Sequence, residues 1–166
     1  GSTRSGVLDH VVALARAGYG VLALDARGHG ESGGRAMDFG WYGDADVAAA
    51  TSYLVTRPDV DGDRIGAVGM SMGGEQAIGA TAGNELLRSV VAEGATARNA
   101  ADLAWLSSHY GIRGALQEQI ERVQERVTDI LTSASVPTSL RSAVEASGDT
   151  HYLLITAGEV EDEAHA

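Results

Sequence analysis

The pattern of apolar and polar positions in the first 25 residues predicts a helix followed by a buried strand. Apolar side chains recur at helical spacing behind Ser5, which would cap the helix, and Gly18 stands where a helix ends in a left-handed residue. Residues 20–24 then form a continuous apolar run closed by Asp25, which is typical of a strand covered on both faces. The apolar positions of the helix are Val7, Leu8, Val11, Val12 and Leu14.

The rest of the chain alternates helical and extended patterns. A second helix is predicted to start at the acidic Asp44 and Asp46 and to end before Pro58. Strands that alternate with helices over short connections predict an α/β fold, with a mostly parallel sheet and helices on both faces. The further elements are a strand at 65–68, a Gly-rich helix at 72–81, a strand at 89–92, a largely helical region at 98–144 and a strand at 152–156.

One helix in this region is amphipathic. Its apolar positions follow steps of three and four residues, and its charged residues occupy the other side. The pattern predicts a helix that packs its apolar stripe on its own domain. The alternatives are a lid over a pocket and a partner-binding helix, and the position between two strands favours the lid of these two. The apolar positions are Ile112, Leu116, Ile120, Val123, Val127 and Leu131, and the charged ones are Glu118, Glu121, Arg122, Glu125 and Arg126.

Length, composition and charge narrow the class of protein. The chain has 166 residues, 44% of them apolar, which suits one soluble globular domain over residues 1–166. No apolar run approaches the roughly 20 residues of a membrane-spanning helix, so we expect no membrane association and take a cytoplasmic location as the default. The 12 basic and 23 acidic side chains give a net charge of −11, which repels phosphates and argues against nucleic-acid binding.

No residue set has convincing spacing for a metal. The chain has no cysteine, which excludes disulfides, thiolate metal sites and cysteine nucleophiles. Residues 59–63 resemble the start of a calcium loop, but Gly62 stands at the fourth place rather than the sixth, and no Glu occupies the twelfth. We interpret them as a polar turn, and we expect no metal and no organic cofactor.

The strongest chemical motif is Gly69-Met70-Ser71-Met72-Gly73, which matches G-x-S-x-G. It follows an apolar strand and opens a helix, the setting in which a sharp turn presents a nucleophilic Ser at the carboxyl edge of a sheet. Small neighbours are needed there, and Gly69, Gly73 and Gly74 supply them. The same turn would direct the backbone N–H of Met72 at the oxyanion formed when Ser71 attacks a carbonyl.

With this motif the sequence resembles the α/β-hydrolase superfamily. The resemblance rests on Gly69 to Gly74 and on Asp25-Ala26-Arg27-Gly28-His29-Gly30-Glu31-Ser32-Gly33-Gly34, and it covers most of the chain. It implies that Ser71 is the nucleophile, that Met72 gives an oxyanion-hole N–H, and that 95–147 form a helical cap-like insertion. It also implies that Asp25, Arg27 and His29 belong to a structural loop.

The triad order in this fold is Ser, then acid, then His. The strand at 152–156 precedes an acidic loop, in which Asp162 is the first candidate for the acid and Glu161 the second. Glu93, at the end of another strand, is a further candidate, and the acidic run after residue 158 could instead be a solvated helix start. His165 lies three residues after Asp162, too close to reach from acid to nucleophile.

The general base is where the sequence departs from the family. The resemblance implies that the base follows one more strand. It also implies that a strand from before residue 1 lies in the sheet between the strand at 20–24 and the strand at 65–68. We therefore expect the chain to be an internal fragment of a longer hydrolase. Otherwise these two strands would pair directly, and sheet edges would self-associate.

The sequence thus predicts a serine hydrolase that cleaves a small-molecule ester, thioester or amide through an acyl-enzyme on Ser71. The 166 residues by themselves should be almost inert, because a Ser hydroxyl without its base is a poor nucleophile. The alternative is a non-catalytic α/β-hydrolase-like module that binds a ligand or partner and lacks the base.

Overall fold

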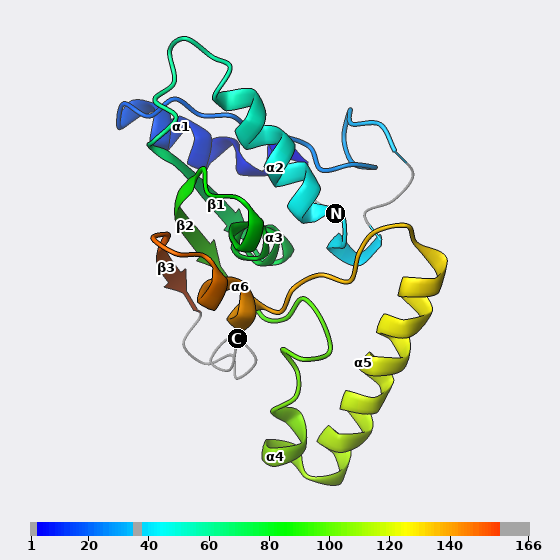
Figure 1. Cartoon of the computed structure of the whole chain (residues 1–166). Coiled ribbons are helices and arrows are strands. Elements are labelled where there is room, and N and C mark those ends of the chain that lie inside the picture. Colours follow the sequence, from blue (N-terminus) through cyan, green and yellow to red (C-terminus); the bar gives the residue numbers. More distant parts are fainter. Residues whose placement is uncertain (1–2, 35–37, 157–166) are drawn as a thin grey trace.

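The structure is a computed structural model, and it describes residues 3–34 and 38–156. Three parallel strands, β1 (Ile65–Met70), β2 (Leu87–Glu93) and β3 (His151–Ile155), form a sheet in the order β1-β2-β3 (Figure 1). Helix α2 (Gly43–Leu54) precedes β1, and α3 (Met72–Ala80) connects β1 to β2, an α/β arrangement that confirms the predicted fold class. Short 3-10 turns lie at Arg4–Val7, Asp38–Gly40 and Thr81–Gly83.

The core lies between the sheet and the helices α3 and α6 (Leu140–Ala146). Small and β-branched side chains let α3 approach the strands closely, and Val90 is among the most buried residues. A second cluster joins Ile65, Ala80 and Leu87 to the side chains of Val47 and Leu54 on α2. The first cluster consists of Ala77, Ile78, Val90, Ala92, Leu140 and Ala143.

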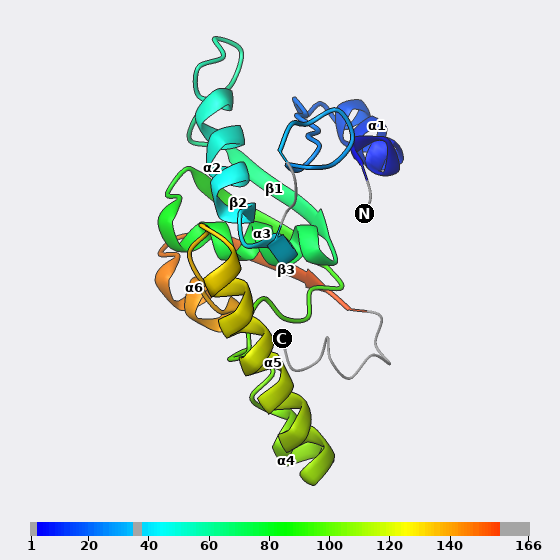
Figure 2. The ribbon, with the colours of Figure 1, turned by 90° about the vertical axis from the view of Figure 1, so that its right-hand side faces the viewer.

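Residues 20–24 are not a strand, so this prediction is wrong. A strand exists only through a hydrogen-bonded partner, and the described residues do not pair with the edge of β1 that faces away from β2. Figure 2 shows α1 (Leu8–Arg16) and the segment after it beside the sheet rather than within it. Direct pairing between this segment and β1 is not observed, and Val21, Leu22 and Leu24 remain exposed.

The first helix forms as predicted, but it is capped differently. Ser5 lies inside the 3-10 turn that precedes α1, and the N-cap is Val7, which makes no side-chain cap hydrogen bond. Gly18 has a φ of 91°, as the prediction of a left-handed helix end requires.

Helices α4 (Leu106–Tyr110) and α5 (Ile112–Leu131) form a hairpin that extends away from the sheet (Figures 1 and 2). Gly114 allows their close approach, because a Cβ there would overlap the carbonyl of Leu106. The prediction that α5 packs its apolar stripe on its own domain is wrong. Its polar side faces the chain instead, where the carboxylates of Glu118 and Glu125 accept hydrogen bonds from backbone N–H groups.

Candidate active site

Ser71 lies between the last residue of β1 and the first residue of α3. Its backbone has φ 51° and ψ −128°, a region that L-residues rarely adopt and that costs about 1–3 kcal/mol. Its N–H donates to the carbonyl of Glu93 at 2.7 Å, which ties the turn to the end of β2. The residue is therefore exposed at the carboxyl edge of the sheet, neither buried nor inside a helix.

The three glycines around Ser71 have different roles. A Cβ at Gly69 would lie 2.5 Å from the N atom of Gly74, so only glycine fits there. A Cβ at Gly74 would lie 3.1 Å from both the side chain of Ala92 and the carbonyl of Gly69. Gly73 has open space where its side chain would be. The steric need predicted for all three glycines therefore holds at Gly69 and Gly74 and is wrong at Gly73.

The N-terminus of α3 begins directly after Ser71, with Met72 as its first residue. The first N–H groups of a helix have no partner within it, and the helix dipole places partial positive charge at this end. The N–H groups of Gly74 and Glu75 turn back to the carbonyl of Ser71. This arrangement can stabilise a negative oxygen beside Ser71.

Two carboxylates border this edge of the sheet. Glu75 accepts hydrogen bonds from the N–H groups of Thr96 and Ala97 at 3.0 and 3.2 Å and so fixes the loop that follows β2. Glu93 is the last residue of β2, pairs in register with Met70, and has an exposed side chain. The other predicted acids, Asp162 and Glu161, lie outside the described residues.

The histidines that the structure describes lie on several elements. His10 is on α1, and His109 is on α4 in the hairpin. His151 begins β3, at the amino edge of the sheet and so opposite to Ser71. His29 lies in the loop after residue 25, where its Nδ1 is 3.2 Å from the carbonyl of Arg27. His165 lies outside the described residues.

The loop around Asp25 is held by its own contacts. The buried Asp25 carboxylate accepts the N–H groups of Arg4 and Glu31 at 2.6 and 3.2 Å, and these bonds hold the pKa of Asp25 below its ordinary value. Arg27 pairs with Asp46 at 2.6 Å, and its guanidinium lies 4.1 Å from the ring centre of Tyr42. These contacts fit the structural role that the resemblance implied for Asp25, Arg27 and His29.

A cavity of about 210 Å³ lies between α5, residues 97–103 and the turn at Phe39. It lies on the carboxyl side of the sheet, because residues 97–103 follow the carboxyl end of β2. Ser71 does not line it, but Gly40, between the lining residues Phe39 and Trp41, packs on the side chain of Met72. Phe39 has φ 56°, and with Ser71 it is one of two non-glycine residues in the described chain with a positive φ. No sequence pattern pointed to Phe39, since a single residue in a turn has no periodicity.

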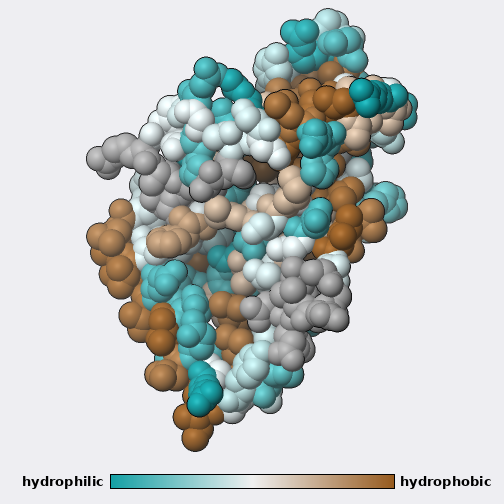
Figure 3. All heavy atoms as spheres, turned by 180° about the vertical axis from the view of Figure 1, so that it is seen from behind, coloured by the Kyte–Doolittle hydropathy of each residue, from teal (hydrophilic) through white to brown (hydrophobic). Residues whose placement is uncertain are grey.

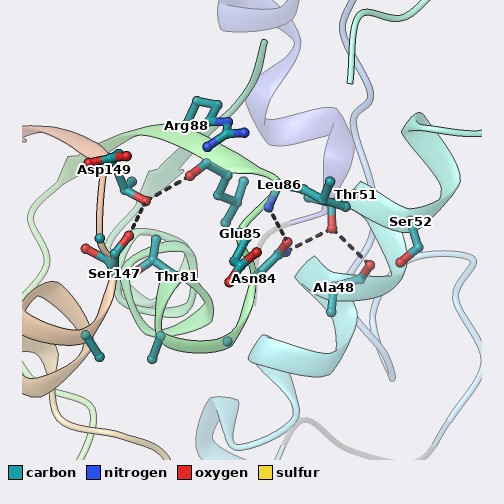
Figure 4. A pocket seen from close by; sticks show the side chains of 16 residues that line it. Ala48, Thr51, Ser52, Thr81, Asn84, Glu85, Leu86, Arg88, Ser147 and Asp149 are labelled. Atoms are coloured by element: carbon teal, nitrogen blue, oxygen red, sulfur yellow. Dashed lines mark hydrogen bonds between the residues drawn. The ribbon is translucent and has the colours of Figure 1, made fainter. Parts of the chain in front are cut away.

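A larger cavity, of about 700 Å³, lies at the opposite, amino edge of the sheet. Figure 4 shows that its polar groups satisfy one another: Asn84 donates to Thr51 at 2.9 Å, and Thr150 donates to the carbonyl of Leu87 at 2.9 Å. This edge is the one opposite to Ser71, so the smaller cavity on the carboxyl side is the better candidate for a substrate site of Ser71.

Within residues 3–34 and 38–156, no group of three or more His, Asp or Glu side chains could hold a metal ion. In the same part of the chain, every helix is too short or too polar to cross a membrane.

The parallel sheet, the helices that pack on it and the serine turn at its carboxyl edge define an α/β-hydrolase fold, here with three strands. A family model described as serine aminopeptidase, S33, matches residues 2–143. The chain therefore belongs to this family of the α/β-hydrolase superfamily.

Proposed function

We propose that the protein is a serine hydrolase that cleaves an ester, thioester or amide bond through an acyl-enzyme on Ser71. The observation that carries the proposal is the strained backbone at Ser71, which sets an exposed hydroxyl against the N-terminus of α3. The family description names an aminopeptidase, which keeps amide bonds among the substrates. A small molecule or a peptide end fits a cavity of about 210 Å³ better than a folded partner does.

In the proposed reaction, the Ser71 oxygen forms a bond to the carbonyl carbon while its proton passes to a histidine base. The carbonyl oxygen becomes negative and is bound by the N–H of Met72. Collapse of this intermediate breaks the bond to the alcohol, thiol or amine, which leaves with the proton from the base. Water then attacks the acyl-enzyme by the same route, which releases the acid and restores the hydroxyl.

The acid that orients the base is proposed to be Asp162, with Glu161 as the second candidate and Glu93 as the third. Glu93 has the structural support of lying beside Met70 at the edge that carries Ser71. The described histidines are placed on α1, in the Asp25 loop, in the hairpin and at the amino edge of the sheet. We therefore propose that residues 1–166 alone react slowly.

Labelling with a fluorophosphonate tests the proposal, because this probe reacts with an activated serine. The protein is expressed with whatever natural sequence its gene encodes on either side of residues 1–166. We expect rapid labelling that disappears in Ser71→Ala and persists in Ser52→Ala, a control at an exposed serine on α2. Mass spectrometry of the labelled peptide locates the adduct. Labelling that survives in Ser71→Ala would contradict the proposal.

The second candidate function is a binding module that has the fold without the chemistry. The placement of the described histidines favours it. In that case the natural protein does not label at all, although Ser71 keeps its exposed position. Slow labelling of residues 1–166 beside rapid labelling of the natural protein excludes this second function and supports the enzyme.

A further inference from the structure

Helix α5 is amphipathic with its polar side turned toward its own chain. Glu118 is buried and accepts a hydrogen bond from the N–H of Ser107 at 2.7 Å, and Glu125 accepts one from the N–H of Ala100 at 2.8 Å. Gly114 and Thr128 are buried on the same side. The carboxylates of this helix thus serve its attachment, which leaves its apolar side outward.

The outward side carries a continuous apolar stripe, here called the α5 stripe. Figure 3 shows it as a brown band along the outer edge of the molecule. Its central members follow each other in steps of four, three, four and three residues, the spacing at which two helices pack side by side in a coiled coil. Over 20 residues the helix is about 30 Å long. The α5 stripe consists of Ile112 (90% exposed), Leu116 (63%), Ile120 (49%), Val123 (58%), Val127 (48%), Ile130 (81%) and Leu131 (80%).

The α5 stripe has the size of half an interface. A fully exposed Val, Leu or Ile offers on the order of 100 Å² of apolar surface, so these exposed fractions amount to roughly 450 Å². The largest apolar patch on a typical monomer is about 300–600 Å² and is often functional, so the α5 stripe falls within that range. A standard interface buries about 800 Å² on each partner, a little over half of it apolar, which is about the area that the α5 stripe offers.

The borders of the α5 stripe allow it to pair with itself. One border carries Gln119 and Arg126, and the other carries Arg113, Gln117 and Gln124. These amides and arginines bring no carboxylate of one copy against a carboxylate of the other, although the chain has a net charge of −11. Glu118 and Glu125 lie on the opposite side of the helix, away from such a contact.

We propose that a second copy of this chain binds the α5 stripe, so that two α5 helices pack stripe to stripe in a two-fold symmetric dimer. A two-fold interface uses the same patch on both copies, as one helix with a self-compatible stripe provides. The proposal is independent of the chemistry at Ser71.

Two other occupants fit the α5 stripe less well. The chain's own residues 157–166 contain one large apolar side chain, Val160, which cannot cover seven positions. Binding to a lipid surface does not require the spacing of a coiled coil. An anionic lipid surface is also repelled by the net charge of −11.

The first test measures molecular mass by light scattering on a size-exclusion column over a dilution series, on the protein expressed with its natural flanking sequence. We expect a dimer that dissociates on dilution. Val123→Glu with Ile130→Glu should weaken it by about 100-fold or more, because both carboxylates would be buried without partners. Circular dichroism checks that this variant folds. The matched control, Ala49→Glu with Tyr53→Glu on an exposed side of α2, should dimerise as before.

The second test uses the absence of cysteine from the chain. Val123→Cys, at the centre of the α5 stripe, should form a disulfide-linked dimer under mild oxidation, whereas Ser52→Cys should form no disulfide-linked dimer on a non-reducing gel. Exchanging the two methyl groups of Val123 for a thiol at a half-exposed position should leave the fold intact, so this test does not depend on the glutamate variant.

Three results would overturn the proposal. The first is a wild-type chain that stays monomeric at every concentration. The second is a dimer that persists in the two-glutamate variant, which would place the interface elsewhere. The third is a monomer that sediments with phosphatidylcholine vesicles and loses this binding in the same variant, which would make lipid the occupant of the α5 stripe.

Discussion

Backbone strain in the described chain is confined to two non-glycine residues, Phe39 and Ser71. Both lie next to Met72: Ser71 directly precedes it, and Gly40, which follows Phe39, packs on its side chain. A left-handed residue persists only where the surrounding structure holds it there, and such residues cluster at sites that bind or react. One of these two residues thus lies in the serine turn, and the other, Phe39, lines the cavity of about 210 Å³.

The glycines around Ser71 give a matched pair of substitutions. Gly69→Ala should destabilise the fold by about 2 kcal/mol or more and lower the labelling of Ser71, because the new Cβ would overlap the backbone of α3. Gly73→Ala adds the same methyl group to open space on a helix and should be neutral or stabilising by up to about 1 kcal/mol. Urea unfolding measures both, and equal losses would contradict the difference assigned to them.

The oxyanion role of Met72 can be tested at its N–H. As the first residue of α3, Met72 can be replaced by proline without loss of an intrahelical hydrogen bond. Met72→Pro should lower kcat of the natural protein by about 10²–10³-fold, since it removes the N–H that would bind the negative oxygen. Met72→Leu keeps this N–H and should retain most of the activity. Thermal unfolding shows whether the proline variant keeps the fold, and unchanged kcat in a folded Met72→Pro protein would exclude this N–H from the mechanism.

At the scale of elements, the sequence predicts periodic structure well and tertiary partners poorly. The runs at 65–68 and 20–24 have the same apolar pattern, yet the first is part of β1 and the second is no strand. The difference is the neighbour: β1 pairs with β2, and the run at 20–24 has no partner among the described residues. The local sequence encodes the tendency of a segment to be extended, whereas the hydrogen bonds between strands depend on a partner that is distant in the sequence.

The same limit applies to α5 and to the candidate site. Spacing identifies the helix and its apolar side, but it does not show that backbone N–H groups at 100 and 107 bind the polar side. For Ser71 the local signal is sufficient, because strand, turn glycines and helix are consecutive in sequence. For Phe39 it is not, because its place beside the site arises from a contact between Gly40 and Met72.

The attachment of the α4–α5 hairpin should depend on pH through Glu118. Hydrogen bonds from the N–H and the side chain of Ser107 and, as a smaller cause, the charge of Arg122 hold the pKa of Glu118 below its ordinary value of 4.5, although burial acts in the opposite direction. A lowered pKa means that the stabilisation is complete above the ordinary value and is lost as the pH falls through the lowered one. Hydrogen exchange of the Ser107 amide, compared with the amides of the sheet core, should therefore speed up selectively in acid.

The matching substitution is Glu118→Gln, which keeps the shape and removes the charge. It should speed exchange at Ser107 several-fold at neutral pH and abolish the acid-dependent change. Asp129→Asn, on an exposed position of the same helix, removes the same charge and should change neither. If Glu118→Gln leaves the exchange and its pH dependence as in the wild type, the carboxylate does not hold the hairpin.

At the scale of the whole molecule, Arg98 joins three parts of the chain. Its side chain is only 3% exposed, pairs with Asp44 of α2 at 2.6 Å, and donates to the carbonyl of Thr138 at 3.0 Å. It lies against Gly79 of α3, where a Cβ would displace the guanidinium. A buried charge of this kind contributes through its partners, because an unpaired one in the same place is strongly destabilising.

Removal of Arg98 should therefore loosen the molecule as a whole. Burial raises the pKa of Asp44, and Arg98 opposes this rise. Arg98→Met should cost about 2–3 kcal/mol near neutral pH, less than for a fully buried pair, because the Asp44 side chain is 38% exposed and solvent screens it. A carboxyl group whose pKa is raised in the folded protein destabilises the fold least when the pH is below the ordinary pKa of the group. The protein loses stability as the pH rises through the raised pKa. Urea unfolding of Arg98→Met should accordingly show a deficit that shrinks as the pH falls from neutral toward 3.8, the ordinary pKa of Asp44.

A double substitution tests the pairing. Adding Asp44→Asn to Arg98→Met should recover part of the loss near neutral pH, whereas Asp44→Asn alone should destabilise, because it leaves the Arg98 charge without its carboxylate. Additive effects of the two substitutions would show that the pair is not coupled and that Arg98 acts through packing alone.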